Sequence, residues 1–144
     1  MLIGQYQHAL DEKKRLAIPS KLRLEVGHKV VVTRGLDKCL FIYPMPIWER
    51  IAEKLGELPV GKSETRQFLR VLLSGATEVE LDSLGRILIP EFLKTYAGLE
   101  KEAVIVGVYN RLEVWDEREW ADYRVEAEKN QDAIAEKLGE VGVY

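Results

Sequence analysis

The chain has 144 residues, and 47% of them are apolar, which suits one or two small domains with a packed core. Its net charge of −3 is not that of a generally basic nucleic-acid-binding protein, but the charge is unevenly distributed. Residues 1–35 carry seven Lys and Arg against three acidic residues, whereas residues 76–144 carry eight against sixteen. This asymmetry is typical of a basic nucleic-acid-binding surface, and ordinary uneven surface charge explains it equally well.

Simple features exclude several classes of protein. No apolar run approaches the ~20 residues that span a bilayer, and residues 1–10 do not resemble a signal peptide, so we expect a cytoplasmic protein that does not bind membranes. The only cysteine, Cys39, excludes an internal disulfide and a four-cysteine zinc site. Because it lies in an apolar segment, we interpret it as a buried side chain.

The sequence contains an internal repeat. Residues 11–19 (DEKKRLAIP) and 82–90 (DSLGRILIP) share Asp, Arg, Ile and Pro at an offset of 71 residues. Residues 40–43 and 112–115, as well as Trp48 and Trp120, match at an offset of 72, so one inserted residue explains the change. We therefore divide the chain into a first repeat, a linker with a bridging helix, and a second repeat, which are residues 1–58, 59–75 and 76–144.

Each repeat is expected to begin with a strand that ends near Leu10 or Leu81. A tight turn follows, in which Asp11 or Asp82 accepts hydrogen bonds from backbone amides two residues on. Gly85 suits a turn position with positive φ, whereas Lys14 occupies the equivalent position at a cost of ~1 kcal/mol.

The second predicted strand covers residues 15–18 or 86–89. Pro19 and Pro90 end this strand and begin a short helix that stops at a glycine. In the first repeat, the short helix is expected at 20–26 and the two strands of the hairpin after it at 29–33 and 39–43. In the second repeat, the helix is expected at 91–97 and the hairpin strands at 103–106 and 111–115.

Three longer helices complete the prediction. The first begins at Pro46, with an apolar stripe that runs to Leu55. The second covers 64–73 with Ser63 as its cap, and its expected buried residues are Phe68, Leu69, Leu72 and Leu73. The third is capped by Asp116 and runs to about residue 138.

One repeat is too short to bury a good core by itself. We therefore expect the two repeats to interleave their strands in a pseudo-dimer. The predicted fold class is α+β and β-rich: a duplicated β-barrel with peripheral helices.

No set of catalytic or metal-binding residues is recognisable. We interpret His8 as a satisfied residue of the barrel and His28 as a solvated loop residue, and neither lies at metal-ligand spacing. Glu78 and Glu80 share one strand face that is expected to meet solvent. There is no glycine-rich phosphate-binding loop. We expect no enzyme activity, cofactor, metal or small-molecule substrate.

The repeated polar feature is the Arg of each turn, Arg15 or Arg86. In one interpretation, each Arg only pairs with its own Asp and clamps the turn. In the other, its planar guanidinium binds phosphates or guanine edges, as a β-ribbon does when it enters a DNA groove. Lys13 and Lys14 add charge to the first turn, so we expect the second turn to contribute less.

These motifs resemble the MraZ family of transcriptional regulators. The resemblance rests on the segments from Asp11 to Pro19 and from Asp82 to Pro90, on residues 4–10, and on the stretch from Tyr43 to Trp48. It implies two swapped-hairpin modules like those of the AbrB regulators, a ring-like homo-oligomer, and binding to direct repeats in promoter DNA through Arg15 and Arg86. Lys14 departs from the glycine that is usual in the family.

The resemblance also implies an association with the nucleoid and with the division and cell-wall gene cluster. The leading hypothesis is therefore a sequence-specific regulator that binds double-stranded DNA. The alternative is a ring-forming structural or interaction protein without sequence-specific DNA binding.

Overall fold

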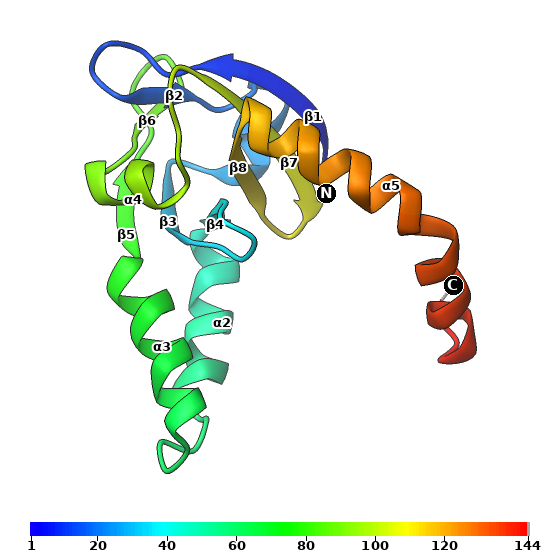
Figure 1. Cartoon of the computed structure of the whole chain (residues 1–144). Coiled ribbons are helices and arrows are strands. Elements are labelled where there is room, and N and C mark those ends of the chain that lie inside the picture. The colour runs from blue at the N-terminus through cyan, green and yellow to red at the C-terminus, as the bar shows by residue number, and fades with distance from the viewer. Residues whose placement is uncertain (144) are drawn as a thin grey trace.

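The structure is a computed structural model, and it describes residues 1–143 (Figure 1). The last residue of the predicted second repeat, 144, therefore lies outside the described residues. The fold is α+β and strand-rich, as predicted. Its strands are β1 (Leu2–Ala9), β2 (Arg15–Ala17), β3 (Lys29–Arg34), β4 (Leu40–Pro44), β5 (Thr77–Glu80), β6 (Arg86–Leu88), β7 (Glu102–Tyr109) and β8 (Leu112–Asp116). Its helices are the 3₁₀ turn η1 (Ser20–Leu22), α1 (Arg23–Val26), α2 (Met45–Gly56), α3 (Ser63–Gly75), α4 (Glu91–Tyr96) and α5 (Glu117–Glu140).

Strands from the two repeats are interleaved in one antiparallel sheet, in the order β1-β7-β8-β4-β3-β5. The first strand of each repeat pairs with a hairpin strand of the other repeat: β1 with β7, and β5 with β3. The two remaining strands, β2 and β6, pair with each other as a separate two-stranded ribbon. Neither repeat could therefore form these sheets from its own strands.

The sheet does not close into the expected barrel. In the part of the chain that the structure describes, β1 and β5 are the two edges of the six-stranded sheet. The short strands β2 and β6, which follow these edge strands in the sequence, pair with each other. Consequently they do not join one edge to the other.

The main core is built from both repeats. Leu16, Ile18 and Val30 of the first repeat lie in one cluster with Ile87 and Leu93 of the second, and all five are fully buried. Because neighbouring strand residues point to opposite faces, Phe41 and Tyr43 lie on the other side of the sheet. There they form a smaller cluster with Cys39 and Trp115, against which the first turns of α2 and α5 pack.

Helices α2 and α3 extend from the sheet on the side away from the ribbon (Figure 1). Two predictions for α3 were wrong. Its N-cap position is Lys62 rather than Ser63, and no side chain caps it. Leu72 is buried as expected, whereas Phe68 and Leu73 are 45% and 41% exposed, because α3 packs against the sheet mainly through β3.

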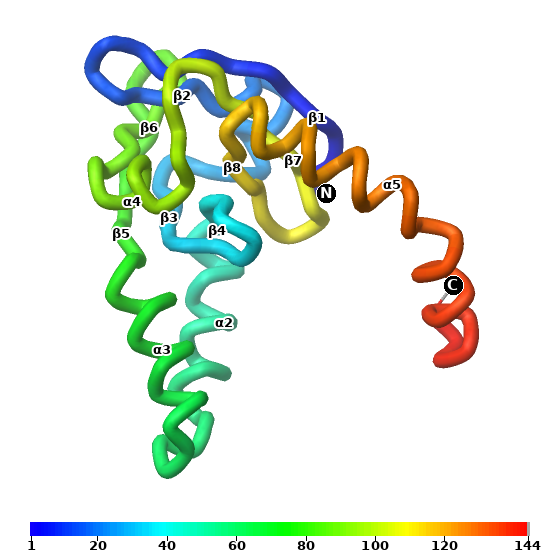
Figure 2. Tube along the Cα trace, in the orientation of Figure 1, coloured from blue at the N-terminus to red at the C-terminus, as the bar shows by residue number. Residues whose placement is uncertain are grey.

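Helix α5 begins at the predicted cap. The Asp116 carboxylate accepts hydrogen bonds from the backbone N–H groups of Arg118 and Glu119. Trp120 and Tyr123 stack with Trp115 of the sheet. The remainder of α5 runs away from the body of the molecule, and none of its residues is buried (Figure 2).

Candidate nucleic-acid interface

The two turns that precede β2 and β6 have the predicted geometry. One carboxylate oxygen of Asp11 accepts hydrogen bonds from the backbone N–H groups of Lys13 and Arg15, each at 2.9 Å. The carboxylate of Asp82 does the same for residues 84 and 86. Gly85 has a φ of 75° and Lys14 a φ of 61°, which confirms that lysine occupies a left-handed position in the first turn.

The β2–β6 ribbon brings the two turns together. Its central pair is Leu16 opposite Ile87, and both side chains are fully buried. Arg15 and Arg86 lie on either side of this pair, and strand alternation therefore directs both to the opposite, outward face. A guanidinium nitrogen of Arg86 lies 3.7 Å from the carboxylate of Asp11, so the two Asp–Arg pairs form one cluster.

Each Arg of this cluster is held by its own Asp. The Nε of Arg15 donates to Asp11 at 2.7 Å, and the Nε of Arg86 donates to Asp82 at 2.8 Å. The Arg–Asp contacts that the clamp interpretation requires are thus present in both turns. Within residues 1–143, no hydrogen bond occupies the terminal nitrogens of Arg15, so this end of its planar fork is free to bind another acceptor.

The turn geometry also lowers the pKa of the Asp11 and Asp82 carboxyl groups. The largest cause is the hydrogen bond from the backbone N–H of Arg15 or Arg86, and the guanidinium of the same residue adds to it. Partial desolvation acts in the opposite direction but does not cancel the effect. Both aspartates are therefore charged at neutral pH and offset the charge of the two arginines.

The two lysines of the first turn differ. Lys14 forms an ion pair with Glu91 of the second repeat, which lowers the pKa of Glu91. Lys13 is exposed and has no ion pair in the described part of the chain. Lys13 is thus the cation of this turn that no carboxylate neutralises.

Pro19 and Pro90 lie where predicted, directly before the short helices η1 and α4.

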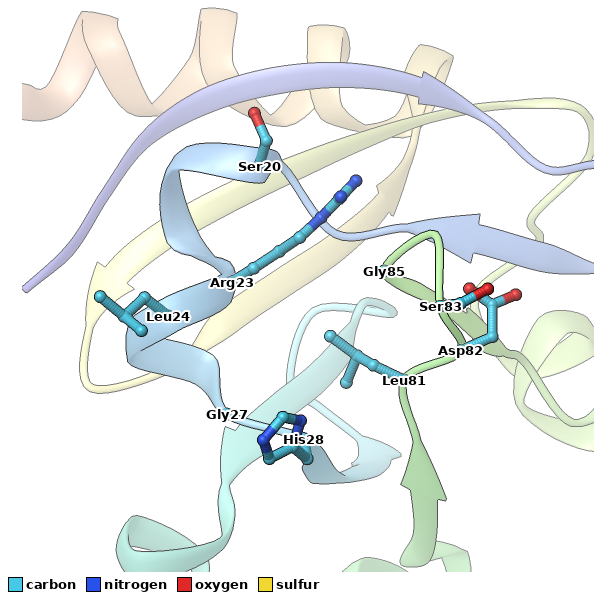
Figure 3. A pocket seen from close by; sticks show the side chains of 9 residues that line it. All are labelled: Ser20, Arg23, Leu24, Gly27, His28, Leu81, Asp82, Ser83 and Gly85. Atoms are coloured by element: carbon cyan, nitrogen blue, oxygen red, sulfur yellow. The ribbon is translucent and has the colours of Figure 1, made fainter.

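Sequence reasoning missed Arg23, which belongs to α1 of the first repeat but reaches the second turn (Figure 3). A Cβ atom at Gly85 would overlap its guanidinium group, so the glycine leaves the space that Arg23 fills. The Nε of Arg23 donates to the carbonyl of Ile18 at 2.8 Å. A weak signal was available, because Arg23 aligns with a second cation, Lys94, in the repeat.

Residues that could have indicated other chemistry lie apart from the ribbon. His28 and Glu80 are exposed, and Glu78 forms an ion pair with Lys29 at the surface. His8 is half-buried on β1. Burial raises the pKa of the Cys39 thiol, so this residue is an inert core side chain, as interpreted.

Residues 1–143 lack two further features that would indicate other functions. None of the helices in residues 1–143 has the length and hydrophobicity of a membrane span. In the same residues, no group of three or more His, Cys, Asp or Glu side chains is placed to hold a metal ion.

Comparisons with known proteins agree with the internal repeat. The family model described as "MraZ protein, putative antitoxin-like" matches the chain twice, over residues 1–71 and 72–140. The chain is 48% identical to the transcriptional regulator MraZ of Clostridium beijerinckii and 44% identical to that of Syntrophomonas wolfei subsp. wolfei. Each alignment covers 99% of this chain and the full length of the relative.

Both relatives bear the name of a transcriptional regulator and not of an enzyme. This agrees with the prediction, made from the absence of converging catalytic residues, that the chain is not an enzyme. The double match to one family model and the identity over full length show that the chain belongs to the MraZ family.

Proposed function

We propose that this chain is a DNA-binding transcriptional regulator that contacts double-stranded DNA through the β2–β6 ribbon and its two turns. The observation that carries this proposal is the placement of Arg15 and Arg86 on one outward face, where a paired carboxylate orients each guanidinium. The name of the relatives supports it. A two-stranded ribbon fits the major groove of B-DNA, which is wide enough to admit one.

The clamp and the DNA contact are compatible at Arg15. The hydrogen bond from Nε to Asp11 fixes the side chain before binding, and less conformational entropy is therefore lost when the terminal nitrogens meet a phosphate or a guanine edge. Lys13 is exposed and flexible, and it suits an unspecific contact with the DNA backbone. Arg15 would then specify the sequence and Lys13 would add affinity.

A single chain is a weak DNA binder on electrostatic grounds. Its net charge is −3, and the two turns carry Asp11 and Asp82 beside their arginines. Useful affinity at physiological salt then needs several chains on one DNA, so that later contacts become effectively intramolecular. We therefore infer a homo-oligomer, ring-like by resemblance to the family.

The internal pseudo-dimer sets the form of this assembly. Because the two-fold relation lies within the chain, further copies are free to associate head-to-tail, and such contacts close into a ring or continue as a filament. Neighbouring copies would present Arg15 in the same orientation. The matching sites are direct repeats in promoter DNA, spaced about one helical turn or about 10–10.5 base pairs apart.

Further parts of the proposal rest on the family resemblance. The first is that the protein regulates the division and cell-wall gene cluster. The second is that it acts in the cytoplasm, in association with the nucleoid. The third is that the two repeats are related as the swapped hairpins of AbrB-like regulators are. The pairing of β1 with β7 and of β5 with β3 supports the swapped-hairpin assignment. The division at residues 1–58, 59–75 and 76–144 stays a prediction.

Substitution of Arg15 tests the proposal. Arg15→Ala should weaken binding to DNA selected from the host genome by about 1–3 kcal/mol per lost Arg contact. Its free energy of unfolding should change by less than about 1 kcal/mol, because the ion pair with Asp11 is partly exposed. Binding is measured by gel shift over a range of salt concentrations, and stability by urea denaturation.

Arg50→Ala is a matched control, because Arg50 is an exposed arginine of α2, on the helical side of the molecule away from the ribbon. If Arg15→Ala binds DNA as tightly as the wild type but unfolds at lower urea concentration, the arginine only clamps its turn. If the wild type assembles but binds no fragment, the alternative of a ring-forming structural protein is correct.

A further inference from the structure

The second turn is not as poor in positive charge as its sequence suggests. The first turn carries Lys14, whereas the second carries Gly85 at the equivalent position. In the structure, the guanidinium of Arg23 occupies the space beside Gly85 where a side chain would start (Figure 3). Each turn thus has a cation at this position in addition to its Arg, and the second turn receives it from the first repeat.

Arg23 differs from the other cations near the two turns in its charge environment. Arg15, Arg86 and Lys14 all form ion pairs with carboxylates, and Lys13 is exposed. Arg23 is half-buried, and the described residues give it no ion pair. Asp82 lines the same open groove, but its carboxylate pairs with Arg86. A partly desolvated cation without a counter-charge is stabilised when an anion binds to it.

The orientation of Arg23 suits such an anion. Its Nε donates to the carbonyl of Ile18, which fixes the plane of the guanidinium and leaves the two terminal nitrogens for another acceptor. The hydroxyl-bearing residues Ser20 and Ser83 line the same groove. A planar fork with two free nitrogens matches the oxygens of a phosphate group.

We propose that Arg23 binds a backbone phosphate of the DNA that the second turn contacts. This inference rests on the proposed function. Arg23 belongs to α1 and not to the ribbon, so it reaches the turn from the side and is placed for the phosphate backbone that flanks a groove. Through Arg23, the first repeat contributes directly to the DNA contact of the second.

The test compares Arg23→Gln with the wild type on the same DNA at several salt concentrations. Loss of one charged phosphate contact per chain should lower affinity about tenfold. It should also reduce the slope of log affinity against log salt by about one per chain on the DNA. Arg70→Gln makes the same charge change on an exposed residue of α3, away from the ribbon, and should alter neither quantity.

A second variant separates a phosphate contact from a structural role. The double substitution Arg23→Lys with Gly85→Lys copies the first turn, because Lys94 aligns with Arg23 and Lys14 with Gly85. Lysine already adopts the required backbone conformation at Lys14. The double variant should recover most of the affinity and salt dependence that Arg23→Gln loses.

Three outcomes contradict the proposals, and they are distinguishable. If the wild type binds DNA and Arg23→Gln matches it in affinity and slope, the inference about Arg23 is wrong and the proposed function stands. If Arg23→Gln loses thermal stability and the double variant recovers no binding, Arg23 is a structural residue of the turn. If the wild type binds no DNA, the proposed function itself fails.

Discussion

Asp11 and Asp82 stabilise their turns in the charged form. Each has a pKa below the ordinary value of 3.8, first because of a backbone N–H and then because of a guanidinium. A carboxyl group whose pKa is lower in the folded state stabilises the fold above its unfolded pKa. That contribution is lost as the pH falls through the lower, folded-state value. The two turns therefore confer acid sensitivity on the protein.

This linkage predicts the pH dependence of a double variant, Asp11→Asn with Asp82→Asn. Asn keeps a carbonyl acceptor for the backbone amides but cannot form the ion pair with Arg15 or Arg86. The difference in unfolding free energy between wild type and variant should be largest near pH 7 and should shrink below about pH 4. Urea denaturation at several pH values measures it. A difference that stays constant down to about pH 3 would show that charge is not the cause.

Single residues were predictable where their role is local. The turn at Asp11, the positive φ at Gly85 and the strained position of Lys14 all follow from the short motif itself. Arg23 was not predictable in the same way, because its position depends on a contact with Gly85, 62 residues later in the chain. Local rules describe the turn but not which segment packs against it.

The β2–β6 ribbon is the element on which the candidate site depends. Each strand has only three residues, and the pair is too short to be stable alone. It is held because Leu16 and Ile87 insert into the main core, where both are fully buried. The orientation of Arg15 and Arg86 on the other face is a consequence of this anchoring.

Substitutions in the ribbon test this dependence. Leu16→Ala and Ile87→Ala should each lower the free energy of unfolding by about 2–5 kcal/mol, because each leaves a cavity. Since the two residues are directly opposite, the effects should be non-additive by about 0.5 kcal/mol or more. Leu88→Ala, on the outward face and 53% exposed, is the control and should change stability by less than about 0.5 kcal/mol. Additive effects would mean that the strands are anchored independently.

Elements were best predicted where their periodicity is clear. The long helices and the β3–β4 hairpin lie close to their expected positions. Strands β1 and β7 are longer than predicted, because each supplies hydrogen bonds to the other from Leu2 to Ala9 and from Glu102 to Tyr109. Such pairing between repeats extends a strand into residues whose own pattern does not alternate.

At the scale of the whole molecule, interleaving explains why the duplicated chain acts as one unit. The main core takes residues from both repeats, and the first strand of each repeat needs a partner from the other. The sequence repeat indicated this mutual dependence. Whether the sheet closes into a barrel was not predictable from the repeat. Two copies of a motif do not determine whether β2 and β6 pair with the edge strands of the sheet or with each other, and in the structure they pair with each other.

The distal part of helix α5 runs away from the body of the molecule (Figure 2). Its apolar residues Trp120 and Tyr123 pack on the sheet, and at helical spacing the same stripe continues through Ile134 and Leu138. Ile134 and Leu138 are 49% and 41% exposed. An apolar stripe that begins on the core and continues past the body is typical of a surface that another protein covers.

In the proposed homo-oligomer, we expect this distal stripe to pack against a neighbouring copy. Ile134→Gln with Leu138→Gln should then lower the mass of the particle in solution, as measured by light scattering or sedimentation. The far-ultraviolet circular dichroism spectrum of the protein should not change, because neither side chain is buried within the chain. DNA binding to an array of direct repeats should fall with the mass, since contacts by neighbouring copies are lost.

Val125→Gln is the matched control, because Val125 is 46% exposed but lies on the opposite side of α5 at 100° per residue. It should leave both mass and binding unchanged. If the stripe variant keeps the mass of the wild type, the copies associate through another surface. If Val125→Gln reduces the mass equally, general polarity of the helix and not the stripe controls assembly. A wild type that sediments as a single chain at all concentrations, yet binds the array tightly, would refute the argument that affinity requires several copies.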